Sequence, residues 1–184
     1  NCECIDINCG CPVPKIVKTG AGSALTRDPD RLFKITKAVV DAAEGTPVTV
    51  KIRSGWEQKM MTWKEAAQAA LDAGVSGITI HPRTRAQGYE GFSDWNIMKE
   101  LVDFVNKKVP VFGSGDLFKP EDAIKMIEQT NVDGVMFARG AMGNPFIFKD
   151  TTSLLTIGKY EPVPIEIRIK TGFAELERLV KETN

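Results

Sequence analysis

The chain has 184 residues, of which 42% are hydrophobic and 26% are charged, values that are ordinary for a globular domain with one sizeable core. Its 24 lysines and arginines are balanced by 24 aspartates and glutamates. A zero net charge argues against a protein that holds nucleic acid through overall basic charge. Any such contact is therefore expected to rest on a local patch or on a region outside this sequence.

Neither a membrane segment nor a disulfide framework is indicated. No stretch reaches the roughly 18 uninterrupted apolar residues of a membrane helix, and no signal peptide opens the chain. The four cysteines, Cys2, Cys4, Cys9 and Cys11, lie together at the start of the sequence. Because no cysteine elsewhere could pair with them, we predict a reducing, cytoplasmic setting without membrane contact.

Short β-rich runs alternate with segments of helical periodicity along most of the chain. The runs lie at residues 4–8, 47–52, 77–81, 109–112 and 133–137. The helical segments are predicted at 30–43, from a capping box at 62–65 to Gly74, at 93–107 and from Pro120 onward. This alternation is typical of βαβ units and predicts a parallel sheet in an α/β fold.

A doubly wound sheet and a (β/α)8 TIM barrel both fit the alternation. The absence of a G-x-G-x-x-G motif and the polar residues at nearly every strand end favour the barrel. A complete barrel takes about 250 residues, so five strands predict the C-terminal portion of one, with the first three strands missing. The start at Asn1 without a methionine fits this prediction of a fragment.

The pattern changes near the C-terminus. Residues 158–164 contain two prolines, and from residue 165 a single charged amphipathic helix follows. We therefore predict a barrel domain over residues 1–158, and a linker with the first helix of a helical domain over residues 159–184.

Polar residues at the strand ends are the candidate site, because the carboxyl ends of barrel strands form the active-site mouth. Lys51 interrupts an apolar strand, where an ammonium needs a functional or structural partner. His81, the only histidine, ends the third run and fits a ligand contact or a hydrogen-bonded structural role equally well.

Two glycine turns close the last two runs. Ser114-Gly115-Asp116 and Ala138-Arg139-Gly140 have the small residues that let backbone N–H groups approach an anion. Turns after the last two strands of a barrel often hold phosphate, so we favour a phosphate cradle over plain loop punctuation.

The cysteine spacing does not match the usual C-x2-C pattern of a metal site, so no metal is predicted. Cys2 and Cys4 alternate along a strand and are expected to be core residues. Cys11 lies between Gly10 and Pro12 in a predicted exposed loop, where a thiol can act as an acid or a nucleophile.

These residues resemble the tRNA-dihydrouridine synthase family. The resemblance rests on the D-x-N-x-G-C-P pattern that ends at Pro12, the AGSAL segment at 21–25, Lys51 with Arg53, and the I-H-x-R-T-R pattern at 80–85. It continues through Gly115-Asp116 to the segment at 139–148 and covers about 140 residues in order. Two positions depart from the family pattern, since Ser114 and Ala138 stand where asparagine and glycine are common.

The resemblance implies FMN-dependent reduction of uridine in tRNA to 5,6-dihydrouridine, with NADPH (or NADH) as the reductant of the flavin. It implies that Cys11 protonates C5 of the uracil while hydride from the flavin goes to C6, and that Asn8 contacts the base. The flavin-contacting residues that it implies are Lys51, His81, Ser114, Gly115, Asp116, Ala138 and Arg139. Arg83 and Arg85 are weaker candidates for contact with tRNA, and the helical domain is expected to bind tRNA.

Two other functions stay open at this point. One is an FMN barrel reductase that acts on a free pyrimidine, and the other is a non-catalytic barrel that binds RNA or phosphate. The residues do not indicate which uridine is reduced, or the oligomeric state.

Overall fold

The computed structural model describes residues 2–183, and its centre is a parallel sheet. The parallel strands are β1 (Ile5–Cys9), β2 (Val48–Glu57), β4 (Gly77–Thr84), β5 (Val111–Ser114) and β6 (Gly134–Met136). Their order in the sheet is β1-β2-β4-β5-β6, and the two-residue β3 (Met60–Met61) pairs antiparallel with β2. Because the order follows the chain without reversal, the sheet has the topology of a βα-barrel and not of a doubly wound fold.

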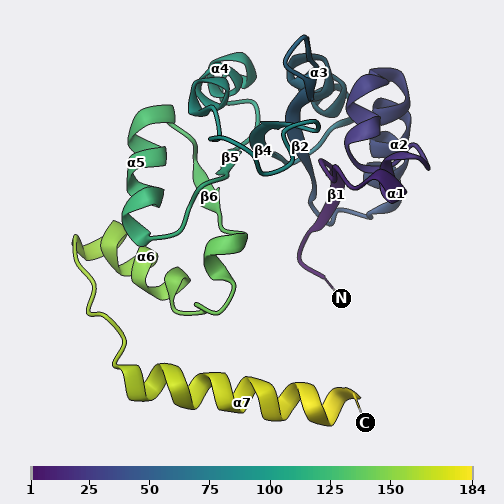
Figure 1. The fold of residues 1–184 in the computed structure, drawn as a ribbon. Coiled ribbons are helices and arrows are strands. Elements are labelled where there is room, and N and C mark those ends of the chain that lie inside the picture. Colours follow the sequence, from purple (N-terminus) through teal and green to yellow (C-terminus); the bar gives the residue numbers. More distant parts are fainter. Residues whose placement is uncertain (1, 184) are drawn as a thin grey trace.

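The helices lie in an arc along the outer side of the strands (Figure 1). The main ones are α2 (Pro29–Ala42), α3 (Trp63–Ala73), α4 (Trp95–Val105), α5 (Pro120–Thr130) and α6 (Ile147–Ile157). Three short segments follow two of the strands, namely α1 (Pro14–Val17) and the 3-10 helix η1 (Gly22–Arg27) after β1, and the 3-10 helix η2 (Arg139–Ala141) after β6.

Local signals in the sequence explain where these helices begin and end. The Asp28 side chain accepts a hydrogen bond from the N–H of Arg31 at the start of α2, and Asp94 does the same for Asn96 at the start of α4. Gly74, with φ 89°, ends α3 in the left-handed conformation that glycine adopts most easily. The helix expected from Pro120 is α5, whose first residue is that proline.

The core lies between the sheet and this helical layer. Val50, Ile52, Ile78 and Ile80 on the two central strands are fully buried. They belong to one apolar cluster with side chains of α2, α3 and α4, among them Leu32, Ala66, Ala70, Met98 and Leu101. Burial of this face fixes the register of the strands, because a shift by one residue would turn every apolar side chain outward.

Several details differ from the sequence expectations. β2 continues to Glu57, because its far end pairs with both β3 and β4. The capping box expected at Thr62 is not formed, since the Thr62 hydroxyl donates to the Thr26 hydroxyl instead (3.0 Å). Cys2 and Cys4 are exposed and are not core residues.

The last helix, α7 (Ile165–Thr183), has no buried residue and stands apart from the sheet (Figure 1). Its exposed apolar side chains are Ile165, Ile167, Ile169, Phe173, Leu176, Leu179 and Val180. An extended stretch after Gly158 separates it from α6. The division into two domains at this stretch stays a prediction. Within residues 2–183, no helix has the length and apolar character that a membrane span requires.

Candidate active site

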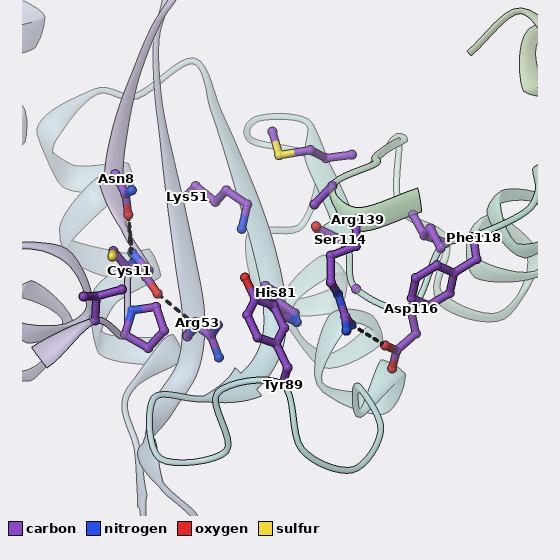
Figure 2. A pocket seen from close by; sticks show the side chains of 17 residues that line it. Asn8, Cys11, Lys51, Arg53, His81, Tyr89, Ser114, Asp116, Phe118 and Arg139 are labelled. Atoms are coloured by element: carbon purple, nitrogen blue, oxygen red, sulfur yellow. Dashed lines mark hydrogen bonds and ion pairs between the residues drawn. The ribbon is translucent and has the colours of Figure 1, made fainter. Parts of the chain in front are cut away.

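A cavity of about 360 Å³ lies at the carboxyl ends of the strands (Figure 2). It has a size that is usual for small-molecule sites. Its lining includes every predicted site residue except Arg83 and Arg85, namely Asn8, Cys11, Lys51, His81, Ser114, Gly115, Asp116, Ala138 and Arg139. Thus the loop with the Cys11 thiol and the two glycine turns open onto the same end of the sheet.

The Cys11 loop is held from three sides. The Asn8 side-chain oxygen Oδ1 accepts hydrogen bonds from the N–H groups of Gly10 (3.0 Å) and Cys11 (2.9 Å). Arg53 Nε donates to the Gly10 carbonyl (2.9 Å). A side chain at Gly22, where φ is 59°, would meet the Cys11 carbonyl at 2.7 Å. The thiol therefore stands on a fixed backbone, and the Asn8 oxygen is used in fixing it.

Two cysteines lie two residues apart and differ in their surroundings. Cys9 is fully buried in the core, and burial, with the nearby Asp6 carboxylate, raises its pKa to about 12. Cys11 is partly exposed and lines the cavity. Of these two neighbouring thiols, only that of Cys11 can meet a ligand in the cavity.

Lys51 and Arg53 alternate along β2 and therefore lie on the same face of the strand, toward the cavity. Burial lowers the pKa of Lys51, and the positive charge of Arg53 lowers it further, while Asp6 acts in the opposite direction. The Lys51 side chain extends into the open space of the cavity (Figure 2). An amine in this position has a strong preference for an anionic or electron-rich ligand.

His81, within β4, is 8% exposed. Burial lowers its pKa to about 3, with further contributions from the positive charges of Arg53, Lys51 and Arg83. The imidazole is therefore neutral at physiological pH. Its Nε2 accepts a hydrogen bond from Arg83 Nη1 (3.3 Å), since a guanidinium can only donate, and this leaves the Nδ1 N–H as the donor of the ring. His81 can therefore act as a hydrogen-bonding group and not as a cation.

Asp116 ties together the loops after β4, β5 and β6. Its carboxylate accepts from Arg83 through both oxygens (2.9 Å each), from the N–H of Ser93 (2.7 Å) and from Arg139 (3.3 Å). Partial burial alone raises its pKa, but the hydrogen bond from Ser93 and the Arg83 guanidinium lower it below the usual value. The carboxylate is thus ionised, and the positive charges of Arg83 and Arg139 compensate its negative charge.

Arg83 and Arg53 hold the loop at residues 85–94 through hydrogen bonds to its backbone. Arg83 donates to the carbonyls of Glu90 (3.2 Å) and Gly91 (2.6 Å), and Arg53 donates to that of Gly88 (2.8 Å). The Arg83 side chain is only 2% exposed. It has little surface to offer to RNA, and the geometry favours a role in positioning this loop.

The turn after β5 presents its backbone to the cavity. Gly115 has φ 118°, and a side chain there would meet Ser93 Oγ at 2.1 Å and His81 Cδ2 at 2.8 Å. Within residues 2–183, the N–H groups of Gly115, Asp116 and Leu117 make no hydrogen bond to another part of the chain. Three adjacent free N–H groups in a cavity wall are suited to an anion.

Arg53 and Tyr89 are polar residues of the cavity wall to which the sequence prediction assigned no role. Arg53 is part of the family pattern with Lys51, and it shares the face of that residue because it lies two positions further along the strand. Tyr89 lies in the 85–94 loop, with its ring 4.5 Å from the guanidinium carbon of Arg139 and 5.9 Å from that of Arg53. No periodicity in the sequence marks it.

The side chains and free N–H groups of the cavity suit an organic ligand that carries an anionic group. Within the described part of the chain, no group of three or more His, Cys, Asp or Glu side chains could hold a metal ion. The fold and this cavity define a βα-barrel protein with a ligand site at the carboxyl ends of its strands.

Comparisons with known proteins place this barrel in a family. The family described as "Dihydrouridine synthase (Dus)" matches residues 1–183. A Treponema pallidum protein named "Probable tRNA-dihydrouridine synthase" is 56% identical over 186 residues, which cover 98% of this chain and 55% of the relative. The "tRNA-dihydrouridine synthase B" of Pseudomonas putida is 39% identical over 180 residues, covering 98% and 50%. The chain belongs to the dihydrouridine synthase family, which confirms the resemblance read from its motifs.

A solved structure supports the fold independently. The chain is similar to a DHODH of Eimeria tenella, crystallised with ferulenol, with a TM-score of 0.61 and 16% identity over 83% of this chain and 49% of that one. The predicted barrel fold is therefore confirmed. The chain spans about half the length of the curated relatives that it matches.

Proposed function

We propose that the protein of which this chain is part reduces uridine in tRNA to 5,6-dihydrouridine, with FMN as cofactor and NADPH (or NADH) as reductant. Family membership and the names of the relatives support the reaction class. The observation that carries the proposal is the meeting of a thiol, a lysine and an anion-binding turn in a single cavity.

The cavity residues fit a flavin mononucleotide. The free N–H groups of Gly115, Asp116 and Leu117 would bind its phosphate together with Arg139, since the one nearby carboxylate, Asp116, is already compensated by Arg83. Lys51 would lie beside the ring and stabilise negative charge there, and neutral His81 would donate a hydrogen bond. When bound, the flavin supplies the hydride for C6 of the uracil.

Cys11 is proposed to deliver the proton to C5. An ordinary thiol is mostly protonated at neutral pH and so has a proton to give. The hydrogen bonds to Asn8 Oδ1 and the Gly10 carbonyl fix the backbone that carries the thiol, so that the proton is delivered from a defined position. Asn8 retains its amide N–H groups for a carbonyl of the base.

The target base has to leave its stack to reach this cavity, as a base does in other enzymes that act on bases within nucleic acid. Binding of the rest of the tRNA would be shared with other parts of the protein. We propose that residues 1–158 form the catalytic barrel portion, and that α7 begins a helical tRNA-binding domain.

The decisive experiment uses the full-length protein and unmodified tRNA transcripts. We expect a yellow protein whose oxidation of NADPH depends on tRNA, with a gain of two hydrogens at a uridine in the product RNA. Equal turnover with free uridine or uracil would favour a reductase of free pyrimidines. A colourless protein that binds tRNA without reducing it would favour a non-catalytic binding barrel.

A further inference from the structure

Two arginines and a tryptophan form a cluster outside the cavity, on the same end of the sheet. The guanidinium carbon of Arg27 lies 4.4 Å from the centroid of the Trp56 ring, and that of Arg85 lies 4.8 Å from the same centroid. We call these three residues the arginine–tryptophan rim. Each comes from a different segment, since Arg27 ends η1, Trp56 lies in β2 and Arg85 follows β4.

The backbone around the rim is fixed. The N–H of Arg85 donates to the Gly55 carbonyl (2.7 Å), and the N–H of Ala86 donates to the Trp56 carbonyl (2.9 Å). The hydrogen bond between the Thr62 and Thr26 hydroxyls (3.0 Å) holds the end of η1 against the start of α3. The indole therefore stands in a set position, and both arginines stack on it.

Neither guanidinium is neutralised. In residues 2–183, neither Arg27 nor Arg85 forms an ion pair or a side-chain hydrogen bond, and Arg85 Nε is buried without a partner. Glu57 and Glu90 line a neighbouring hollow but pair with neither arginine. Two cations held at one ring repel each other, and a bound anion would relieve this repulsion.

The indole ring lies against the central carbon of each guanidinium group, and within residues 2–183 no protein acceptor takes the terminal N–H donors. Those donors match the oxygens of a phosphodiester in a bidentate arrangement. Because the whole chain has no net charge, contact with a polyanion has to come from a local group such as this one.

The rim lies further along the strand that carries Arg53, a cavity residue. Trp56 follows Arg53 by three positions, roughly 10 Å along β2 at about 3.3 Å per residue, and a register shift between Arg53 and Gly55 interrupts the regular alternation of side chains between the two faces. We infer that the arginine–tryptophan rim binds phosphates of the RNA strand that flank the nucleotide in the cavity. This inference rests on the proposed function, because it takes the ligand in the cavity to be a nucleotide of RNA.

The test measures binding of full-length protein to an unmodified tRNA transcript as a function of KCl concentration. In the Arg27→Gln/Arg85→Gln variant we expect the affinity to fall on the order of tenfold or more near 0.1 M salt. The slope of log K against log salt should lose about 1.4 to 1.8, the contribution of two phosphate contacts. A matched control, Lys107→Gln/Lys108→Gln, removes two charges from the turn between α4 and β5 at the opposite end of the strands and should leave both quantities unchanged.

Variants of Trp56 separate positioning from charge. Trp56→Leu keeps both cations but removes the ring, and it should lower the salt slope as the arginine variant does, whereas Trp56→Phe should retain most of it. Flavin content should stay at the native level in all of these variants.

Native affinity and salt slope in the double arginine variant would overturn the inference. So would a loss confined to binding of poly-glutamate, which would indicate an acidic protein partner. Failure of the proposed function would be seen separately, because the native protein would then bind tRNA without reducing it.

Discussion

Two pairs of arginines at the mouth of the sheet are held in opposite ways. Arg53 and Arg83 are 3% and 1% exposed, and their donors bind backbone carbonyls and the Asp116 carboxylate. Arg27 and Arg85 instead lie over the Trp56 ring, and within residues 2–183 their side chains bind no protein acceptor. The difference teaches that unpaired donors, and not residue type or proximity to the cavity, distinguish an arginine that can bind a ligand from one that builds a site. The predictions below test this contrast between inner wall and rim.

The largest effect is expected at the inner wall, on the reaction itself. Cys11→Ala in the full-length protein should retain its flavin but reduce tRNA about 10² to 10⁴ times more slowly, because the proton donor is lost. Single-turnover reduction of tRNA by the pre-reduced enzyme measures this step. Cys9→Ala is the matched control, since it removes a buried thiol two residues away and should leave the rate near the native value. Native turnover of Cys11→Ala would show that the thiol is not the acid.

The next effect concerns the partner of Arg83. Asp116→Ala leaves the guanidinium of Arg83, 2% exposed, without its carboxylate, and should lower the free energy of unfolding by about 3 kcal/mol. The control is Asp41→Ala, which breaks the exposed pair between Lys37 and Asp41 and should cost less than about 0.5 kcal/mol. Chemical denaturation of the full-length variants provides both values. Similar losses for the two variants would contradict the inner-wall role of Asp116.

The lowered pKa of His81 predicts that the stability of the fold depends on pH. Its pKa is about 3 in the folded chain and 6.5 in an unfolded one, so between these values the unfolded state binds a proton that the folded state does not. Stability therefore rises with pH across this window, by at most about 1.4 kcal/mol per pH unit from this residue. His81→Gln should show a weaker loss of stability between pH 7 and pH 5 than the native protein. Parallel curves for the two proteins would mean that His81 titrates normally.

The smallest effect on folding is expected at the rim. Arg27→Gln removes an exposed stacking contact and should lower the free energy of unfolding by less than about 1 kcal/mol. The same change should nevertheless lower the salt slope of tRNA binding by about one phosphate contact. A large loss of stability would instead make Arg27 part of the structural wall, like Arg83.

Much of the fold followed from the spacing of strands and helices, because a parallel sheet with helical crossovers leaves a regular pattern in the sequence. The extension of β2 to Glu57 could not be predicted, since it depends on pairing with β3 and with the end of β4. The missing cap at Thr62 could not be predicted either, because the direction of its hydroxyl, which donates to Thr26, depends on a tertiary contact.

The candidate site was predictable to the extent that it lies at strand ends. Ser114 ends β5, whereas Lys51 and His81 lie within β2 and β4, which continue to Glu57 and Thr84, and all three line the cavity on the parallel strands. The burial of Arg83 and the placement of Tyr89 were not predictable, because both depend on the path of the 85–94 loop. That path is fixed by hydrogen bonds to backbone carbonyls, which no side-chain pattern records.

The hydrogen bonds of Asn8 have a consequence for selectivity. Its Oδ1 accepts from two backbone N–H groups, which fixes which way the amide is turned and leaves only hydrogens to face the cavity. A pyrimidine edge that carries a keto oxygen can approach those hydrogens, whereas an edge that carries an exocyclic amine meets them donor against donor. Under the proposed function, the turn that holds the Cys11 loop would thereby also favour a uracil-like ring over a cytosine-like one.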